Sequence, residues 1–164
     1  MSLHASNPFK LVAYVDASFA CHVPGMRSQT GAVITLGGGA IYAKSTKQKL
    51  NATSSTEAEL IGISDALRQI LHIREFLIHQ GIDIGPALLY QDNQSTLKLI
   101  ERGRSTAEAT RHINVRYYFI TDRIGAGEIE TEYLPTESML ADLLTKPLQG
   151  ALFEKFVSEI LNLT

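Results

Sequence analysis

Four acidic residues stand where their side chains can meet, and they are the feature of this sequence that most suggests chemistry. Asp16 follows the apolar run 11–15 and Asp92 follows the apolar run 88–91, so each acid ends a predicted strand. Glu57 lies in the first turn of a predicted long helix, and Asp142 lies in a predicted short helix near the end of the chain. Because ligands bind at the carboxyl edge of open α/β sheets, the four carboxylates can converge there.

A cluster of four carboxylates is stable in its charged form only beside a cation, because like charges repel one another. Mg2+ and Mn2+ prefer carboxylate and water oxygens as ligands. Two such ions can activate a water molecule and stabilise the leaving oxygen of a phosphate ester. The pattern therefore suggests hydrolysis of a phosphodiester with two metal ions.

Each acid also has a purely structural explanation. Glu57 can complement the dipole of its helix, Asp92 can cap the helix that follows, and Asp142 can be a solvated helix residue. Asp16 is the hardest to explain in this way, because a charged residue directly after five apolar ones needs a reason. The residue types alone leave the choice open.

The elements that must position these acids can be read from the apolar periodicity. We expect a strand within the periodic segment 9–19 that ends at Asp16, and further strands over 29–36 and 40–46. A helix from 57 or 58 to Gly81, a strand over 88–91 and a short helix near 97–100 should follow. The rest of the chain predicts a helix over 107–124, a strand over 129–134, a short helix over 140–144 and a last helix around 152–160. Gly37 to Gly39 are followed by a strand, so they predict a hairpin turn rather than a phosphate-binding loop. This order predicts an α/β fold with a mixed sheet flanked by helices on both faces.

The composition places all of this in one domain. The 164 residues are 45% hydrophobic and 20% charged, which is enough apolar material for one core. We expect residues 1–8 to be a leader, partly disordered or left over from cloning, and 9–164 to be the domain. The single Cys21 excludes an internal disulfide and a cysteine-based zinc site. Neither a membrane span nor a signal peptide is apparent, so we expect an intracellular protein, cytoplasmic or nuclear.

Several longer motifs in register resemble a known family, the ribonuclease H domains of Ty1/copia-type retrotransposon polyproteins. The motifs are Tyr14-Val15-Asp16-Ala17-Ser18, Ser54-Ser55-Thr56-Glu57-Ala58-Glu59-Leu60, Gln91-Asp92-Asn93-Gln94-Ser95, Thr110-Arg111-His112-Ile113-Asn114-Val115-Arg116-Tyr117, Tyr133-Leu134-Pro135-Thr136-Glu137 and Leu140-Ala141-Asp142-Leu143-Leu144-Thr145-Lys146-Pro147. The resemblance implies a ribonuclease H-like fold with a five-stranded mixed sheet. It also implies metal-dependent cleavage of the RNA strand of RNA–DNA hybrids, which leaves 5′-phosphate and 3′-hydroxyl ends.

Carried over onto this sequence, the family's four metal-binding and catalytic acids are Asp16, Glu57, Asp92 and Asp142. The resemblance implies two Mg2+ ions, for which Mn2+ can substitute. Asp16 and Asp92 would face both ions, Glu57 would bind one ion near the RNA 2′-hydroxyl, and Asp142 would complete the other. It further implies a reverse transcriptase domain of the same polyprotein as a neighbour, no membrane, and a monomeric isolated domain.

The substrate contacts are expected in two groups. Near the acids we expect Ser18, Thr56, Asn93, Gln94 and Ser95, and as phosphate contacts we expect Lys44, Lys47, Arg111 and His112. For His112 a half-buried helix histidine is an equally good explanation. The net charge of −2 does not itself indicate a nucleic-acid binder, although two divalent ions would turn it into +2.

Two positions depart from the family pattern. The loop 134–139 has no histidine where cellular ribonucleases H often have one, and Glu137 is the candidate replacement. Gln91 stands where related domains often have a cysteine, and the sequence gives it no meaning. A catalytically weak module that binds nucleic acid and depends on an adjacent reverse transcriptase is the alternative function. Integrases and transposases use three acids with different spacing.

Overall fold

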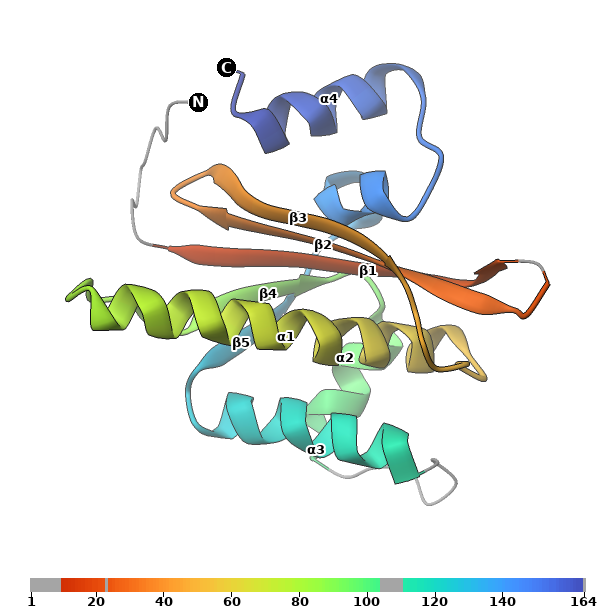
Figure 1. The fold of residues 1–164 in the computed structure, drawn as a ribbon, viewed down its shortest axis with the longest axis horizontal. Helices are drawn as coiled ribbons and strands as arrows, with labels where there is room; N and C mark the ends of the chain where they lie inside the picture. Colours follow the sequence, from red (N-terminus) through yellow and green to blue (C-terminus); the bar gives the residue numbers. More distant parts are fainter. Residues whose placement is uncertain (1–9, 23, 104–110, 164) are drawn as a thin grey trace.

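The computed structural model describes residues 10–22, 24–103 and 111–163, and its centre is one five-stranded sheet (Figure 1). The strands are β1 (Leu11–His22), β2 (Arg27–Leu36), β3 (Gly39–Lys47), β4 (Ala87–Gln91) and β5 (Ile129–Tyr133). Their order is β3-β2-β1-β4-β5, with β1, β2 and β3 antiparallel and β1, β4 and β5 parallel. This is the predicted mixed sheet. Gly37 and Gly38 form the tight turn between β2 and β3 with φ of 61° and 93°, as the hairpin prediction requires.

Helices cover both faces of the sheet, as predicted. On one face lie α1 (Ser55–His79), α2 (Gln94–Glu101) and α3 (Arg111–Gly125). On the other face lie the 3-10 helix η2 (Leu140–Leu144) and the last helix α4 (Gly150–Leu161). A second 3-10 helix, η1 (Thr136–Ser138), precedes η2 in the chain. The predicted leader 1–8 and the predicted helix start 107–110 lie outside the described residues. Among the described residues, no helix has the length and apolar character that crossing a membrane requires.

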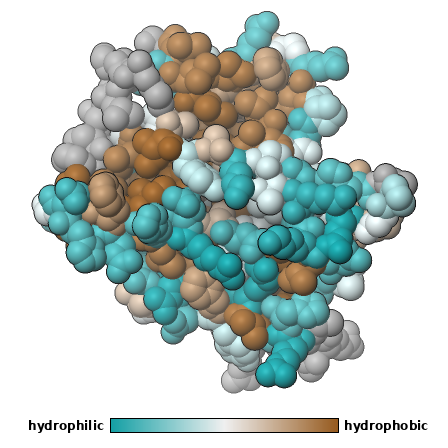
Figure 2. All heavy atoms as spheres, in the orientation of Figure 1, coloured by the Kyte–Doolittle hydropathy of each residue, from teal (hydrophilic) through white to brown (hydrophobic). Residues whose placement is uncertain are grey.

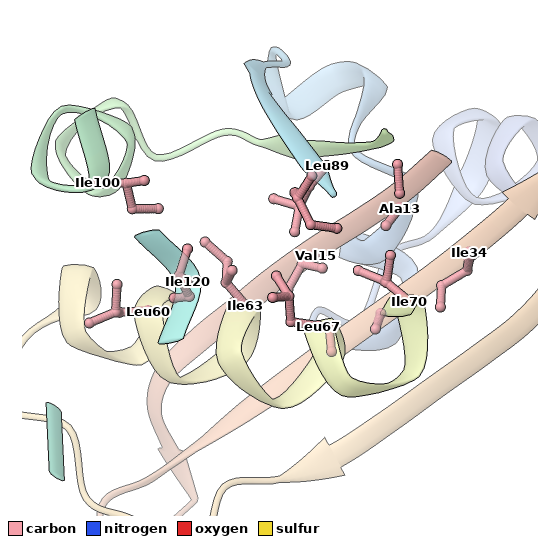
Figure 3. Packing of buried hydrophobic residues seen from close by; sticks show 14 of the residues in the cluster. Ala13, Val15, Ile34, Leu60, Ile63, Leu67, Ile70, Leu89, Ile100 and Ile120 are labelled. Atoms are coloured by element: carbon pink, nitrogen blue, oxygen red, sulfur yellow. The ribbon is translucent and has the colours of Figure 1, made fainter. Parts of the chain in front are cut away.

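The core fixes α1 on two sides at once (Figure 3). Ile63, Leu67 and Ile70 pack with residues of the sheet such as Val15 and Ile34. The same cluster contains Leu60 of α1 together with Ile100 of α2 and Ile120 of α3. A helix that is buried against a sheet and against two other helices cannot rotate, so any side chain that it points at the sheet has a fixed position.

A second, smaller cluster holds η2 and α4 on the opposite face, where Val33 of β2 packs with Leu140 and Phe156. Figure 2 shows apolar side chains at the surface over α4. Phe153 and Leu161 of this helix are exposed. Hydrophilic side chains cover much of the surface over β3 and α1 in the same view.

Gly31 lets η2 lie directly on β2. A Cβ at this position would stand 2.6 Å from the carbonyl oxygen of Ala141 and 2.8 Å from the side chain of Thr145. No residue larger than glycine fits there without displacing the η2 backbone, which carries Asp142. Gly31 is also the partner of Asp16 across the β1–β2 ladder, so this close approach places Asp142 above Asp16.

The strand containing Asp16 does not end where the sequence predicts. β1 continues to His22 as an antiparallel partner of β2, with an irregularity after Ser18 and a positive φ of 50° at Ala20. Asp16 therefore lies within a strand rather than at its end. The apolar run stops at Asp16 because the acid side chain faces η2, not because the strand stops.

Candidate metal and active site

Three of the predicted acids meet at one place. One carboxylate oxygen from each of Asp16, Asp92 and Asp142 lies within 4.8 Å of the others. They come from β1, from the residue directly after β4, and from η2. Asp16 and Asp142 are each only 2% exposed, whereas Asp92 is partly exposed.

The fourth acid at this place is Glu59 and not the predicted Glu57. Glu59 is 4% exposed, and its Oε1 accepts a hydrogen bond of 3.2 Å from the backbone N–H of Ala17. Together with Asp16 and Asp92 it lines a cavity of about 380 Å3, which we call the acid cavity. Glu57 is not among the residues that line this cavity.

Glu57 instead completes the start of α1. Its carboxylate accepts hydrogen bonds of 2.7 Å from both the backbone N–H and the hydroxyl of Thr53. The hydroxyl of Ser54 in turn accepts a hydrogen bond of 3.2 Å from the Glu57 N–H. This arrangement is a variant of the capping box, so the structural explanation of Glu57 accounts for its position.

The helical period explains why the two glutamates differ. Residues two positions apart on a helix point about 200° apart, because 3.6 residues make one turn. Glu59 shares its face with Ile63, Ala66 and Ile70, which are buried in the main core cluster. Two signals in the sequence therefore distinguish the glutamates: the Ser54-x-x-Glu57 capping pattern, and the register of Glu59 with the buried face.

The surroundings of these acids disfavour the ionised form of their carboxyl groups. Burial, followed by the charges of Asp16 and Asp92, raises the pKa of Glu59 to about 9. Burial is also the main cause that raises the pKa of Asp142 to about 6, and it raises the pKa of Asp16 as well. Four hard oxygen donors that repel one another in a buried place are a donor set that fits divalent ions such as Mg2+ or Mn2+.

Donors from the segment after η2 hold two of the acids. Lys146 Nζ lies 2.7 Å from an oxygen of Asp142 and 3.7 Å from one of Asp16. The Thr145 hydroxyl donates to the second oxygen of Asp16. On the opposite side, the Thr136 hydroxyl of η1 donates to Asp92 over 2.9 Å. The orientation of these carboxylates is therefore set by the Thr136–Lys146 segment.

The predicted substrate residues next to the acids divide between two neighbouring cavities. Asn93 and Gln94 line the acid cavity. Asn93 also caps α2, since its side-chain oxygen accepts from the N–H groups of Ser95 and Thr96 over 3.0 and 3.1 Å, so the helix cap is Asn93 and not Asp92. Thr56 and Ser95 line a separate cavity of about 370 Å3, together with the cations Lys98 and Arg102.

The predicted basic contacts come together, but not in the acid cavity. Lys44 and Lys47 line a cavity of about 320 Å3 between β3 and α1, and Arg111 and His112 line one of about 540 Å3 between α1 and α3. Arg68 and Arg116 belong to both cavities, so the two are continuous. We call the set the basic surface: Lys44, Lys47, Lys49, Arg68, Arg111, His112 and Arg116. Arg116 also pairs with Asp65 over 2.6 Å.

Two other predicted positions lie away from the acids. Ser18 belongs to the part of β1 that pairs with Gln29 beyond Asp16, and it does not line the acid cavity. Glu137, the candidate replacement for the loop histidine, is exposed in η1, and its carbonyl oxygen accepts from Lys155.

Comparison of the sequence with curated proteins finds retrotransposon polyproteins. The chain is 33% identical over 144 residues, 88% of its length, to the retrovirus-related Pol polyprotein from transposon TNT 1-94 of Nicotiana tabacum. It is 32% identical over 159 residues to the corresponding polyprotein of transposon RE1 of Arabidopsis thaliana, and 33% identical over 142 residues to the Ty1-NL2 Gag-Pol polyprotein of Saccharomyces cerevisiae. The chain spans 11% of the length of each plant polyprotein and 8% of the yeast one. No family model matches the sequence.

Comparison of the fold finds ribonucleases H. LC11-RNase H1, isolated from compost by a metagenomic approach, superposes with a TM-score of 0.62 over 82% of this chain and 91% of its own, at 18% identity. The N-terminal RNase H domain of rv2228c from Mycobacterium tuberculosis gives 0.57 over 92% and 97%, at 13% identity. LC11-RNase H1 has also been crystallised in complex with an RNA/DNA hybrid. At these identities the likeness establishes the ribonuclease H-like fold. With that fold and these relatives, the chain belongs to the ribonuclease H-like region of Ty1/copia-type retrotransposon Pol polyproteins.

Proposed function

We propose that this chain is a metal-dependent endonuclease that hydrolyses the RNA strand of RNA–DNA hybrids and leaves 5′-phosphate and 3′-hydroxyl ends. The observation that carries the proposal is the convergence of Asp16, Glu59, Asp92 and Asp142 from four separate elements. Burying three acids together beside a fourth is costly unless cations are bound, so a purely structural role does not explain the cluster.

The acids would hold two Mg2+ ions, with Mn2+ as a substitute. Asp16 and Asp92 would face both ions, Asp142 would complete one of them, and Glu59 takes the place that the sequence assigned to Glu57. When bound, the ions supply an activated water and charge neutralisation at the leaving oxygen. The protein's own contribution is orientation: Thr136, Thr145 and the Ala17 N–H hold individual carboxylate oxygens in place.

The hybrid would be read close to the acids by its shape and its 2′-hydroxyl groups. Asn93 and Gln94 line the acid cavity and offer amide groups to the minor groove, where one strand of a hybrid carries 2′-hydroxyls. Next to them, Thr56, Ser95, Lys98 and Arg102 offer hydroxyls and positive charge to a backbone phosphate. Ser18, on the extension of β1, would contact the strand beyond the cleavage position.

The basic surface would hold nucleic acid farther from the cleavage position. It contains six of the fifteen Lys and Arg residues of a chain whose net charge is −2, so the positive charge is concentrated there. Contacts between such residues and phosphates add affinity that depends on salt but not on sequence. In the polyprotein, a reverse transcriptase domain would supply further contacts to the same substrate, while the isolated domain would be a monomer.

The test is the cleavage of a hybrid whose RNA strand carries a label, beside duplex DNA and duplex RNA of the same sequence. We expect cleavage of the hybrid alone, in the presence of Mg2+ or Mn2+, and none with Ca2+. Undiminished cleavage in excess chelator would contradict the metal-dependent mechanism. A protein that binds the hybrid and Mn2+ but leaves the RNA intact would instead be a nucleic-acid-binding module.

A further inference from the structure

Gln91, the last residue of β4, carries a polar side chain that is fully buried, with 0% exposure. Its Nε2 donates a hydrogen bond of 3.1 Å to Oε2 of Glu59 and lies 3.5 Å from the carbonyl oxygen of Val15. Its Oε1 accepts a hydrogen bond of 2.9 Å from the backbone N–H of Asn93. Both ends of the carboxamide are therefore used, and one end meets the acid cluster.

These partners determine which way the carboxamide points. A backbone N–H only donates, so Oε1 must face the N–H of Asn93, and Nε2 then faces Glu59. Each oxygen of Glu59 then has one donor, the Ala17 N–H on Oε1 and Gln91 on Oε2. The two donors fix the rotation of the Glu59 carboxylate about its last bond.

The same side chain also fixes the segment that follows Asp92. The Asn93 backbone is held by Gln91, while the Asn93 side chain caps α2 through Ser95 and Thr96. The carbonyl oxygen of Gln91 accepts from the N–H of Leu134 at the end of β5. Gln91 thus connects α1, the start of α2 and the segment that leads to η1.

We propose that Gln91 is a positioning residue that couples the Glu59 carboxylate to the substrate-contacting segment Asn93–Ser95. This inference rests on the proposed function, because it treats Glu59 as a metal ligand and Asn93 and Gln94 as substrate contacts. A change at Gln91 then alters metal binding and hybrid binding together, although Gln91 itself has no exposed atom to offer to either.

The variant that tests the coupling is Gln91→Met, which keeps the length and charge of the side chain but removes both hydrogen bonds. We expect its affinity for Mn2+, measured by calorimetry on the free protein, to fall at least tenfold. Its affinity for a labelled hybrid in excess chelator should fall at least threefold. The control is Leu89→Ala, a fully buried change in the same strand that lowers the melting temperature without touching the network. Equal effects of the two variants on both affinities would overturn the inference.

A second variant keeps the test valid if Gln91→Met does not fold. The exchange Glu59→Gln with Gln91→Glu restores the hydrogen bond between residues 59 and 91 and the one from the Asn93 N–H, and it loses the 3.5 Å contact to the Val15 carbonyl oxygen. It also moves the carboxylate away from the acid cavity. We expect it to keep the slow hydrogen exchange of the Asn93 amide while losing Mn2+ binding. If the Asn93 amide of this double variant exchanges its hydrogen at least tenfold faster than the wild-type amide does, the coupling is overturned.

The outcome for Gln91 is separate from the outcome for the nuclease. A wild-type protein that binds Mn2+ but does not cleave the hybrid would end the proposed function, while the comparison of variants would still support Gln91. A wild-type protein that cleaves, with Gln91→Met indistinguishable from Leu89→Ala, would end the inference about Gln91 alone. A wild-type protein that binds no Mn2+ would overturn both.

Discussion

The acid cavity and the basic surface differ in the burial of their charged groups. The acids Asp16, Glu59 and Asp142 are buried, and each accepts at least one hydrogen bond from a neighbouring donor. Lys44, Lys47 and Arg111 are exposed. Burying a charge is costly, whereas exposing one costs almost nothing. The burial of the acids therefore needs a functional explanation. Exposed basic residues need none until a ligand is shown to bind them.

The largest effect is expected for Asp92→Asn. Asparagine keeps the shape and can still accept the hydrogen bond from Thr136, but it removes one negative charge and most of the affinity for a metal ion. Cleavage of the hybrid should fall by orders of magnitude, because the activated water and the stabilised leaving oxygen depend on the same ions. In excess chelator the melting temperature should stay the same or rise, since carboxylate repulsion is relieved. Normal cleavage with a lowered melting temperature would mean that Asp92 is structural.

The two glutamates of α1 form a matched pair. We expect Glu59→Gln to lose cleavage by orders of magnitude, as Asp92→Asn does. Glu57→Gln should keep cleavage within a few fold of wild type and lose about 0.3–1 kcal/mol of stability, because glutamine still accepts from Thr53 but no longer carries the charge that complements the helix dipole. Initial cleavage rates and thermal melts of both variants give the answer. The reverse result would restore the assignment that the sequence alone suggested.

Gly31→Ala tests how closely η2 must approach the sheet. A Cβ 2.6 Å from the Ala141 carbonyl oxygen must displace η2 and with it Asp142. We expect a loss of about 1–3 kcal/mol, typical of overpacking, and a cleavage rate at least tenfold lower. Gly85→Ala is the control, because an added Cβ there meets nothing within 4 Å. If Gly31→Ala changes stability as little as Gly85→Ala does, the close approach does not hold Asp142.

The smallest effect is expected on the basic surface. Replacing Lys44, Lys47 and Lys49 together by Glu should weaken hybrid binding and flatten its dependence on salt by about 0.9 per lost phosphate contact. The cleavage rate at saturating hybrid should stay within twofold, because none of the three lines the acid cavity. Lys155→Glu, on the opposite face of the sheet, is the control for a general charge effect. A salt slope unchanged from wild type would show that these lysines only meet solvent.

The order of strands and helices was predictable because each element carries its own periodicity. The strand that contains Asp16 was predicted too short, since its second half pairs with β2 while exposing alternate residues, and such a pattern looks like a loop. The choice between Glu57 and Glu59 needed the rotation of α1 about its axis, which Leu60, Ile63 and Leu67 determine together.

The distance of the basic residues from the acid cavity could not be read from the sequence, because nothing in the order of residues shows that β3 and α3 lie on either side of α1. Gln91 could not be interpreted at all from the sequence. Its meaning depends on Glu59, which is 32 positions away in the chain.

The place of Asp142 in the chain has a consequence for biosynthesis. The sheet, α1 and three of the four acids come from residues that leave the ribosome before η2 does, and η2 then settles over Gly31 with the last carboxylate. A nascent chain that has folded its sheet therefore still lacks one of the four acids. The acid cluster is therefore complete only after η2 has packed against β2 at Gly31, so formation of the sheet alone does not assemble the site.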